Sequence, residues 1–326
     1  MTRIGAAAVP DTRHTASSRL RWAGIRPDAG LLAALLSAAT FASSGPFAKS
    51  LLAAGWTPGS VVTARVGIAG LVLLGPALYA VRHRLLVLRE SAGLVVAFGL
   101  VAVAGCQVAY FNAVQRMPIG VALLLEYLGV VLVVLWVSVR TRRVPTRSTV
   151  LGVVACLGGL ALVLDLSGGG GLDPVGVLWG LIAAIGLAVY FVVSAHGGTG
   201  LPPVALAGFG MLVGAAALGI FGWVGVLPVG VAATPVTLGD ASLPWWVAVA
   251  ELALVAAAAA YLLGAIGARR LGSTVASFVG LTEVLFAVGL AWLLLGEVPS
   301  GIQAAGGALI LAGVVAVRVG ELRAGS

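Results

Sequence analysis

Two glutamates stand in the middle of long apolar runs, where charged side chains are unexpected. Glu126 follows three leucines, and Glu283 follows a leucine and a threonine. Inside a bilayer, an ionisable side chain near a helix centre costs about 2.5–3.5 kcal/mol on insertion scales, so each one needs a reason. A carboxylate in such a place could bind an ammonium group or carry a proton. The alternative is that each glutamate only satisfies a polar partner inside a helix bundle.

Further polar side chains within the apolar runs are candidate site residues. Arg65 could bind a carboxylate, or its long side chain could reach the membrane surface. Glu251 lies nearer the end of its run. Its side chain could face a pore or a water-filled outer vestibule. Gln107, Tyr110 and Asn112 could donate hydrogen bonds to a ligand, although contacts between helices commonly explain such residues.

Composition restricts the elements that can position these residues. Only 9% of the 326 residues are charged and 60% are hydrophobic, whereas soluble domains have about 25% charged residues. Such a chain has too little polar surface to cover a soluble globule and too much apolar surface to stay disordered. Two cysteines, both inside apolar runs, exclude a disulfide scaffold. The sequence therefore predicts an all-α polytopic membrane protein.

Ten apolar runs are long enough to cross a bilayer as helices, which takes about 20 residues. The runs are about twice as long as a barrel strand and lack its two-residue alternation, so strands are not expected. The predicted spans are 29–53, 59–81, 91–113, 118–139, 148–166, 174–195, 202–226, 243–267, 273–295 and 300–318.

Basic residues are distributed unequally between the loops of this topology. With the N-terminus inside, nearly all of the 19 basic residues lie in inner segments, and Arg116 is the basic residue of the outer loops. The positive-inside rule therefore predicts that both termini face the cytoplasm. Because the charge of +8 serves to orient a membrane protein, no nucleic-acid partner is expected. Residues 1–28 and 319–326 are predicted cytoplasmic tails, the first of them basic and disordered.

A shift of 154 residues superposes the fourth and fifth predicted spans on the ninth and tenth. It places Gly152 on Gly306 and Gly159 on Gly313. Five helices are an odd number, so two copies of such a unit must insert in opposite directions. Inverted repeats of this kind are typical of secondary transporters, whose substrate site lies near the midplane.

The same shift relates the two intramembrane glutamates. Glu126 maps to Gly280, which stands three residues before Glu283. Three residues are nearly one helical turn, so the two carboxylates occupy similar faces of equivalent helices. We therefore expect both carboxylates to face one central cavity.

The chain resembles the EamA family of the drug/metabolite transporter superfamily. The residues that carry the resemblance are Lys49, Pro58 and Arg65 in the first repeat, Pro118 through Ala122 with Glu126 in the fourth helix, and Leu295-Gly296-Glu297 with 306–314 near the end. The resemblance implies ten helices in two inverted five-helix repeats, which we place at 29–167 and 174–318. It also implies transport of small metabolites.

Within the family, Met117 through Ala122 with Glu126 through Gly129 is similar to the threonine/homoserine exporters. One departure concerns Val130 and Val284, which stand where the family often has proline in its fourth and ninth helices. Because proline is a common cause of helix kinks, we expect these two helices to be less kinked.

Together these features predict a secondary transporter that exports small metabolites, such as amino acids, across the cytoplasmic membrane. Its partners would be a small-molecule substrate and the lipid bilayer, with no cofactor or metal; the oligomeric state is left open. Enzyme activity is not expected, because His14, His83 and His196 lie in the predicted tail or loops and no HExxH or GxSxG motif occurs. No phosphate-binding loop supports ATP-driven pumping. A channel and a non-transporting sensor or scaffold are the alternatives.

Overall fold

The computed structural model describes residues 29–83, 85–117, 119–164, 173–196, 200–296 and 298–324. The predicted N-terminal tail at residues 1–28 lies outside the described residues. So do Pro118 and Glu297, which carry part of the family resemblance.

The first half of the chain forms helices joined by short connections. They are α1 (Ala29–Ala42), α2 (Ser44–Ala53), α3 (Pro58–Val81), α4 (Leu85–Glu90), α5 (Ala92–Ala97), the π-helix η1 (Phe98–Gly105), α6 (Cys106–Val114), α7 (Ile119–Tyr127), α8 (Gly129–Thr141) and α9 (Arg147–Val163). Thr57 and Thr146 begin α3 and α9, because each side chain accepts a hydrogen bond from a backbone N–H of the first turn.

The second half repeats this helical pattern and adds a short hairpin. Its elements are α10 (Pro174–Ala195), α11 (Pro203–Trp223), β1 (Val236–Leu238), β2 (Ala241–Leu243), α12 (Trp245–Ala253), the π-helix η3 (Leu254–Ala259), α13 (Ala260–Leu271), α14 (Ser273–Gly280), α15 (Thr282–Leu295) and α16 (Gly301–Ala324). Asp173 caps α10, and Pro174 fills the first helical position, where its missing N–H costs nothing.

Nine helical segments of the described chain are long and apolar enough to cross a bilayer, and several consist of two or three consecutive helices. The fifth predicted span, 148–166, corresponds to α9, a shorter apolar helix of 17 residues. The segments match the ten predicted spans, with ends that differ by a few residues. The last helix, α16, continues to Ala324, so residues 319–324 of the predicted tail are helical.

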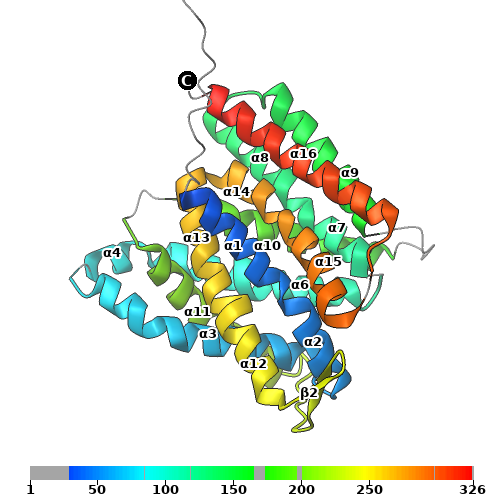
Figure 1. Cartoon of the computed structure of the whole chain (residues 1–326). Helices are drawn as coiled ribbons and strands as arrows, with labels where there is room; N and C mark the ends of the chain where they lie inside the picture. The colour runs from blue at the N-terminus through cyan, green and yellow to red at the C-terminus, as the bar shows by residue number, and fades with distance from the viewer. Residues whose placement is uncertain are drawn as a thin grey trace, which may run out of the picture.

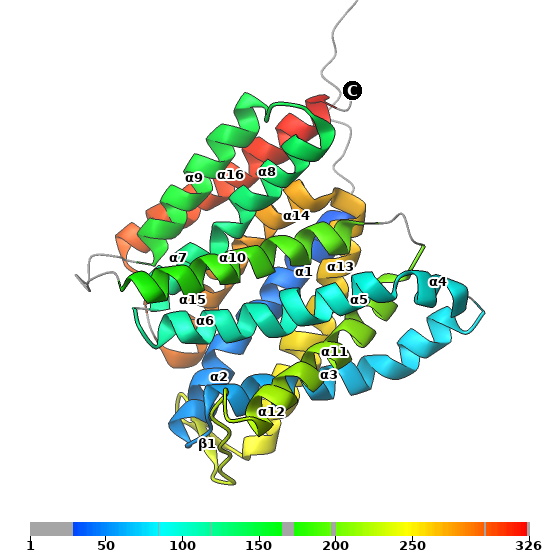
Figure 2. The same ribbon diagram turned by 180° about the vertical axis from the view of Figure 1, so that it is seen from behind.

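Equivalent helices of the two halves pack in matching pairs. The pair α9 and α16 and the pair α3 and α11 each join equivalent helices, while α1 lies against α13 and α6 against α10. In Figures 1 and 2, α9 and α16 form a layer beside the rest of the bundle. A Cβ on Gly159 would lie 2.5 Å from the carbonyl oxygen of Gly306, so glycine is what permits these two backbones to approach.

The fourth and ninth spans are both interrupted near the middle, although neither contains proline there. The N–H of Leu128 donates to the carbonyl of Leu125, and that of Leu281 donates to the carbonyl of Phe278, both at 3.1 Å. Each bond reaches three residues back instead of four, which tightens the turn between α7 and α8 and between α14 and α15. Both spans are therefore interrupted without proline, because a tightened turn also interrupts a helix, and the expectation that they are less kinked than in the family stays a prediction.

The third and eighth spans share another irregularity. Each contains a π-helix, η1 in the first half and η3 in the second, at positions that correspond under the 154-residue shift. Such segments occur often at functional sites. Here η1 ends directly before Cys106, which faces the central cavity described below.

A β-hairpin, which the sequence analysis does not predict, lies between α11 and α12. Its strands β1 and β2 are antiparallel and joined by Gly239 and Asp240, with Gly239 at a φ of 59° that few other residues tolerate. Val236 of β1 is buried against Leu51 and Trp56 at the ends of the first and second spans. The hairpin thus closes one end of the bundle (Figure 1).

The opposite end of the bundle is where α8, α13 and α16 finish (Figure 1), and it carries most of the basic residues of the described part of the chain. We call it the basic end and the other the hairpin end. The arginines of the basic end that follow α8 or complete α13 are Arg140, Arg142, Arg143, Arg269 and Arg270.

Candidate functional site

A cavity of about 210 Å³ lies between helices of both halves. Five of the six predicted site residues line it: Arg65 from α3, Gln107 and Tyr110 from α6, Glu126 from α7 and Glu283 from α15. The first, third, fourth, sixth, eighth and ninth spans contribute further side chains, whereas α9, α11 and α16 contribute none. The expected convergence of both carboxylates on one cavity is thus what the fold produces.

The interruptions of the fourth and ninth spans set the positions of the two glutamates. Glu126 stands two residues before the tightened turn at Leu128, and Glu283 stands two residues after the turn at Leu281. Because the two halves are inverted, these opposite offsets bring both side chains to the same cavity. Both carboxylates lie close enough to repel one another electrostatically.

Each carboxylate has one side-chain donor beside it. The thiol of Cys106 donates to Oε1 of Glu126 at a Sγ–Oε1 distance of 3.4 Å, and the Tyr127 hydroxyl is the donor group that acts on Glu283 in the same cavity. One donor each leaves most of the acceptor capacity of two carboxylates unused. The site can therefore accept further donors, such as the N–H groups of an ammonium.

Arg65 provides the positive charge of the cavity. Its residue is only 9% exposed, and its Nε is buried without a hydrogen-bond partner. The guanidinium attracts Glu126 and Glu283, yet within the described part of the chain it forms no ion pair with either. Arg65 therefore does not reach the membrane surface, and the cavity separates it from the acidic groups.

An aromatic wall, defined as Phe41, Tyr190, Phe191 and Tyr261, completes the cavity. The ring centroids of Tyr190 and Phe191 lie 5.0 Å apart, and those of Phe41 and Tyr261 also 5.0 Å apart, in edge-to-face geometry. The Tyr190 hydroxyl is buried without a partner among the described residues. A Cβ at Gly264 would overlap it, so glycine at this position makes room for the hydroxyl.

Sequence reasoning missed the aromatic wall and Cys106, which it used only to exclude a disulfide scaffold. A usable signal exists for the tyrosines. The chain has five tyrosines, and four of them, Tyr110, Tyr127, Tyr190 and Tyr261, line the cavity. Tyrosines normally gather at membrane interfaces, so the positions of Tyr127 and Tyr261 well inside their spans could have marked the site.

Glu251, the sixth predicted site residue, does not line the cavity. Its Oε1 accepts a hydrogen bond from Ser43, the residue between α1 and α2, and its Oε2 is buried without a partner. The guanidinium of Arg65 also attracts this carboxylate. Glu251 therefore stands next to the cavity, at the junction of two half-helices.

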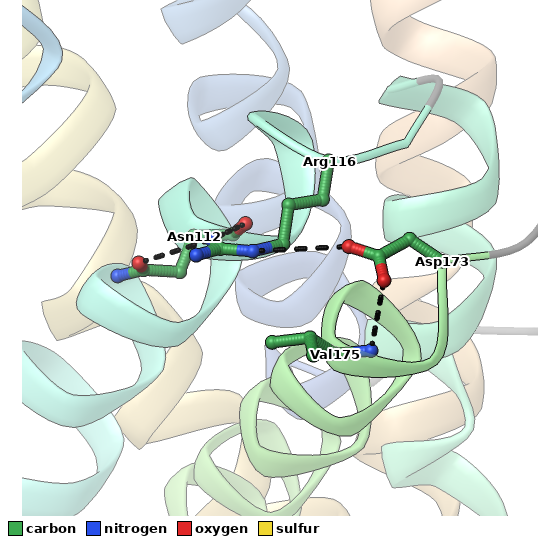
Figure 3. A network of polar contacts seen from close by, with 4 residues as sticks. All are labelled: Asn112, Arg116, Asp173 and Val175. Atoms are coloured by element: carbon green, nitrogen blue, oxygen red, sulfur yellow. Dashed lines mark hydrogen bonds and ion pairs between the residues drawn. The ribbon is translucent and has the colours of Figure 1, made fainter.

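Asn112 serves the packing of helices and not the cavity. Its amide donates to the carbonyl of Val108, and Arg116 donates to its backbone and side-chain oxygens. Figure 3 shows Arg116 reaching onward to Asp173, with Nε and Oδ2 3.8 Å apart, while Asp173 caps α10 through the N–H of Val175. This network ties the third span to the sixth, in keeping with the alternative that contacts between helices explain Asn112.

Among the described residues, no cluster of three or more histidine, cysteine or acidic side chains could hold a metal ion. The lining of the cavity offers charge, hydrogen-bonding groups and aromatic surface for recognition. These are suited to binding a small charged solute reversibly.

Comparison with known proteins shows which structures and which family this chain is similar to. A protein of known crystal structure is similar to the chain with a TM-score of 0.73 and 24% sequence identity, over 91% of this chain and 99% of that chain. No curated protein sequence matches the chain. Residues 28–165 and 174–319 each match the EamA-like transporter family. The predicted all-helical membrane fold of two inverted halves is confirmed. The prediction that the chain is not an enzyme is also confirmed, because the family consists of transporters. The chain belongs to the EamA-like transporter family, within the drug/metabolite transporter superfamily.

Proposed function

We propose that this transporter exports small zwitterionic metabolites, amino acids or close relatives, across the cytoplasmic membrane by alternating access. One observation carries the proposal. A buried arginine and two half-buried glutamates line the same cavity without forming an ion pair among the described residues. Buried charges are costly when they lack partners. A solute with one negative and one positive group would supply both partners at once.

The charges suggest how such a solute lies in the cavity. Its carboxylate would accept hydrogen bonds from the Arg65 guanidinium, and its ammonium would donate to Glu126 or Glu283. The unpartnered Tyr190 hydroxyl and the aromatic wall are left to contact the remaining side chain. Drug-sized ligands use pockets of about 300–1,000 Å³, so a cavity of about 210 Å³ favours a smaller solute.

Proton exchange is the coupling that the paired glutamates favour. A proton bound by Glu126 or Glu283 cancels the charge that holds the ammonium, so proton and substrate compete for one site. Competition of this kind lets a proton gradient drive a second solute in the opposite direction. The tightened turns beside both glutamates, at Leu128 and Leu281, divide these spans into segments that could tilt as access alternates.

The orientation and the branch are part of the same proposal. The basic end would face the cytoplasm, with both termini inside, because basic loops are retained there. The segments 29–167 and 174–318 would act as the two repeats that rock about the cavity. The residues Met117 through Ala122 with Glu126 through Gly129 support the threonine/homoserine exporter-like branch.

The test is transport by the purified full chain in proteoliposomes with an imposed pH gradient. A panel of amino acids, amines and carboxylic acids would be compared for wild type, Glu126→Gln and Glu283→Gln. Glu90→Gln, the same change at an exposed residue of α4, is the matched control. We expect saturable, gradient-driven movement of a zwitterion that falls at least about tenfold in either cavity variant.

The other outcomes separate the alternatives. Movement that is saturable but unaffected by both cavity variants would retain the transporter and reject the carboxylate mechanism. Movement without saturation and without exchange of labelled for unlabelled solute would indicate a channel. Absence of movement across the whole panel would favour a sensor or scaffold.

A further inference from the structure

A second, shallower cavity of about 170 Å³ opens at the basic end, apart from the central one. It lies where the end of α8, the end of α10 and the start of α14 pack against one another. In Figure 2 these three helices converge beneath the layer of α9 and α16. The residues that line it are Trp136, Val137, Arg140, Thr141, Val192, Ala195, His196 and Ser273.

One side of this cavity is suited to an anion. Arg140 and His196 both line it, and the lining includes no acidic side chain. The Nη2 of Arg269 donates to the His196 carbonyl at 3.3 Å, which keeps a second guanidinium beside the site. Ser273 begins α14, where the first backbone N–H groups lack helical acceptors and the helix dipole is positive.

The other side of the cavity is apolar and exposed. Trp136 is 53% exposed, and Val137, Val192 and Ala195 lie beside it in the lining. Next along α8, Val139 is 76% exposed, as expected for a side chain that faces acyl chains. Tryptophan at this depth is typical of the boundary between headgroups and hydrocarbon. A soluble anion would leave this apolar surface uncovered.

We propose that this cavity binds the headgroup of an anionic phospholipid. Its phosphodiester would accept hydrogen bonds from Arg140 and Ser273 beside His196, and the start of an acyl chain would cover Trp136. Basic pockets between helices near a membrane surface recognise such headgroups. The assignment requires neither the zwitterionic substrate nor proton coupling.

The position of this lipid gives it a consequence for transport. The helices α8 and α14 are the basic-end portions of the interrupted spans that carry Glu126 and Glu283. A lipid seated between α8 and α14 bridges these two portions. It would stabilise the arrangement in which they lie together at the basic end.

The test measures lipid retention and thermal unfolding of the full chain. The protein is delipidated in neutral detergent and titrated with phosphatidylglycerol, phosphatidylcholine or inorganic phosphate. Native mass spectrometry counts retained lipid, and the unfolding midpoint reports stabilisation. Arg140→Gln removes the pocket charge. Arg143→Gln removes the same charge three residues along, at an exposed position outside the lining.

We expect wild type and Arg143→Gln to retain phosphatidylglycerol in preference to phosphatidylcholine, and Arg140→Gln to bind it about tenfold more weakly than Arg143→Gln. Trp136→Ala, a second variant, should weaken lipid retention while the protein stays folded. Equal losses in both arginine variants would overturn the proposal, since they would indicate a diffuse charge effect. Equal retention of both lipids, or the same stabilisation by inorganic phosphate, would also overturn it.

Discussion

The Sγ atom of Cys156 lies 3.5 Å from the carbonyl oxygen of Ile310, the residue that stands 154 positions later. That separation is the shift that superposes the two halves, so a residue here meets its own equivalent. A Cβ on Gly152 would lie 3.0 Å from the Gly313 carbonyl, and one on Gly159 would approach Gly306. Such reciprocal contacts are the mark of a two-fold axis. The axis that relates the halves therefore passes between α9 and α16 at Cys156 and Ile310.

The glycines on this axis predict a sharp difference between two neighbouring substitutions. In Gly159→Ala, the new methyl group would lie 2.5 Å from the Gly306 carbonyl oxygen and 2.9 Å from Ile310. We expect the free energy of unfolding to fall by about 1–3 kcal/mol, because the neighbouring backbone cannot yield easily.

The matched control is Gly158→Ala, whose methyl group would find Leu309 at 3.8 Å, an ordinary contact. The unfolding midpoint of this variant should equal that of wild type or lie slightly higher, since alanine favours the helix. Unfolding curves in detergent measure both. Equal destabilisation of the two variants would contradict the close approach at Gly159.

Replacement of Arg65 should affect substrates according to whether they carry a carboxylate. In Arg65→Gln, we expect uptake of the transported amino acid to fall about 10–100-fold, because charge-assisted hydrogen bonds to its carboxylate are lost. The amine with the same side chain and no carboxylate should lose much less. Solute counterflow in proteoliposomes measures both rates. Arg89→Gln, at an exposed position of α4, is the control, and an equal loss for both solutes would argue against contact with the carboxylate.

The two cysteines predict selective labelling. Both are buried, but Cys106 lines the cavity beside Glu126, whereas Cys156 lies in the contact between α9 and α16, outside the lining of that cavity. A small maleimide should therefore modify Cys106 in the Cys156→Ala variant and block its transport. Saturating substrate should slow this labelling. Mass spectrometry of intact protein measures the labelling. Rapid labelling of the Cys106→Ala variant under the same conditions would contradict this prediction, because the reagent would then reach Cys156 without passing through the cavity.

The overlap between Gly264 and the Tyr190 hydroxyl predicts a rescue. Gly264→Ala should destabilise the protein by about 1–3 kcal/mol, because the new methyl group competes for the space of that hydroxyl. Tyr190→Phe removes a buried hydroxyl that has no partner among the described residues, so it should be neutral within about 1 kcal/mol.

The double variant of Gly264 and Tyr190 then becomes the decisive measurement. It should recover at least half of the lost stability, because the atom that clashes is gone and the two changes are not additive. Thermal unfolding of wild type, the two single variants and the double variant completes this double-mutant cycle. Strict additivity would mean that the methyl group meets a different obstacle, such as Ser37, whose Oγ would lie at 2.8 Å.

Much of this architecture could be predicted because it depends on local composition and on the thickness of a bilayer. The ten spans follow from run length alone, and the cost of burial singles out Glu126 and Glu283. Their shared cavity follows from the repeat, since a symmetry operation carries one glutamate close to the other. Arg65 was ambiguous, because the length of its side chain allows both a surface and a buried position.

The features that escaped prediction depend on tertiary packing. Nothing in the types of Leu128 and Leu281 announces a tightened turn, which forms where Gly129 and Gly280 approach α10 closely. Glu251 looks like the other intramembrane glutamates in sequence, yet it accepts a hydrogen bond from Ser43 at the junction of α1 and α2 and does not line the cavity. The hairpin of β1 and β2 is too short to produce a period-two pattern.

Arg65 has no counterpart in the second half, since α11 contains no charged residue. The backbone is therefore nearly symmetric about its axis, whereas the electrostatic potential within it is not. The field across the cavity runs from α3 toward α7 and α15, and a low-dielectric surrounding strengthens it. A dipolar solute that enters from either side of the membrane meets the same field, so it is turned to one orientation before any contact forms. The polarity of the bound molecule is thus set by the protein and not by the side of entry.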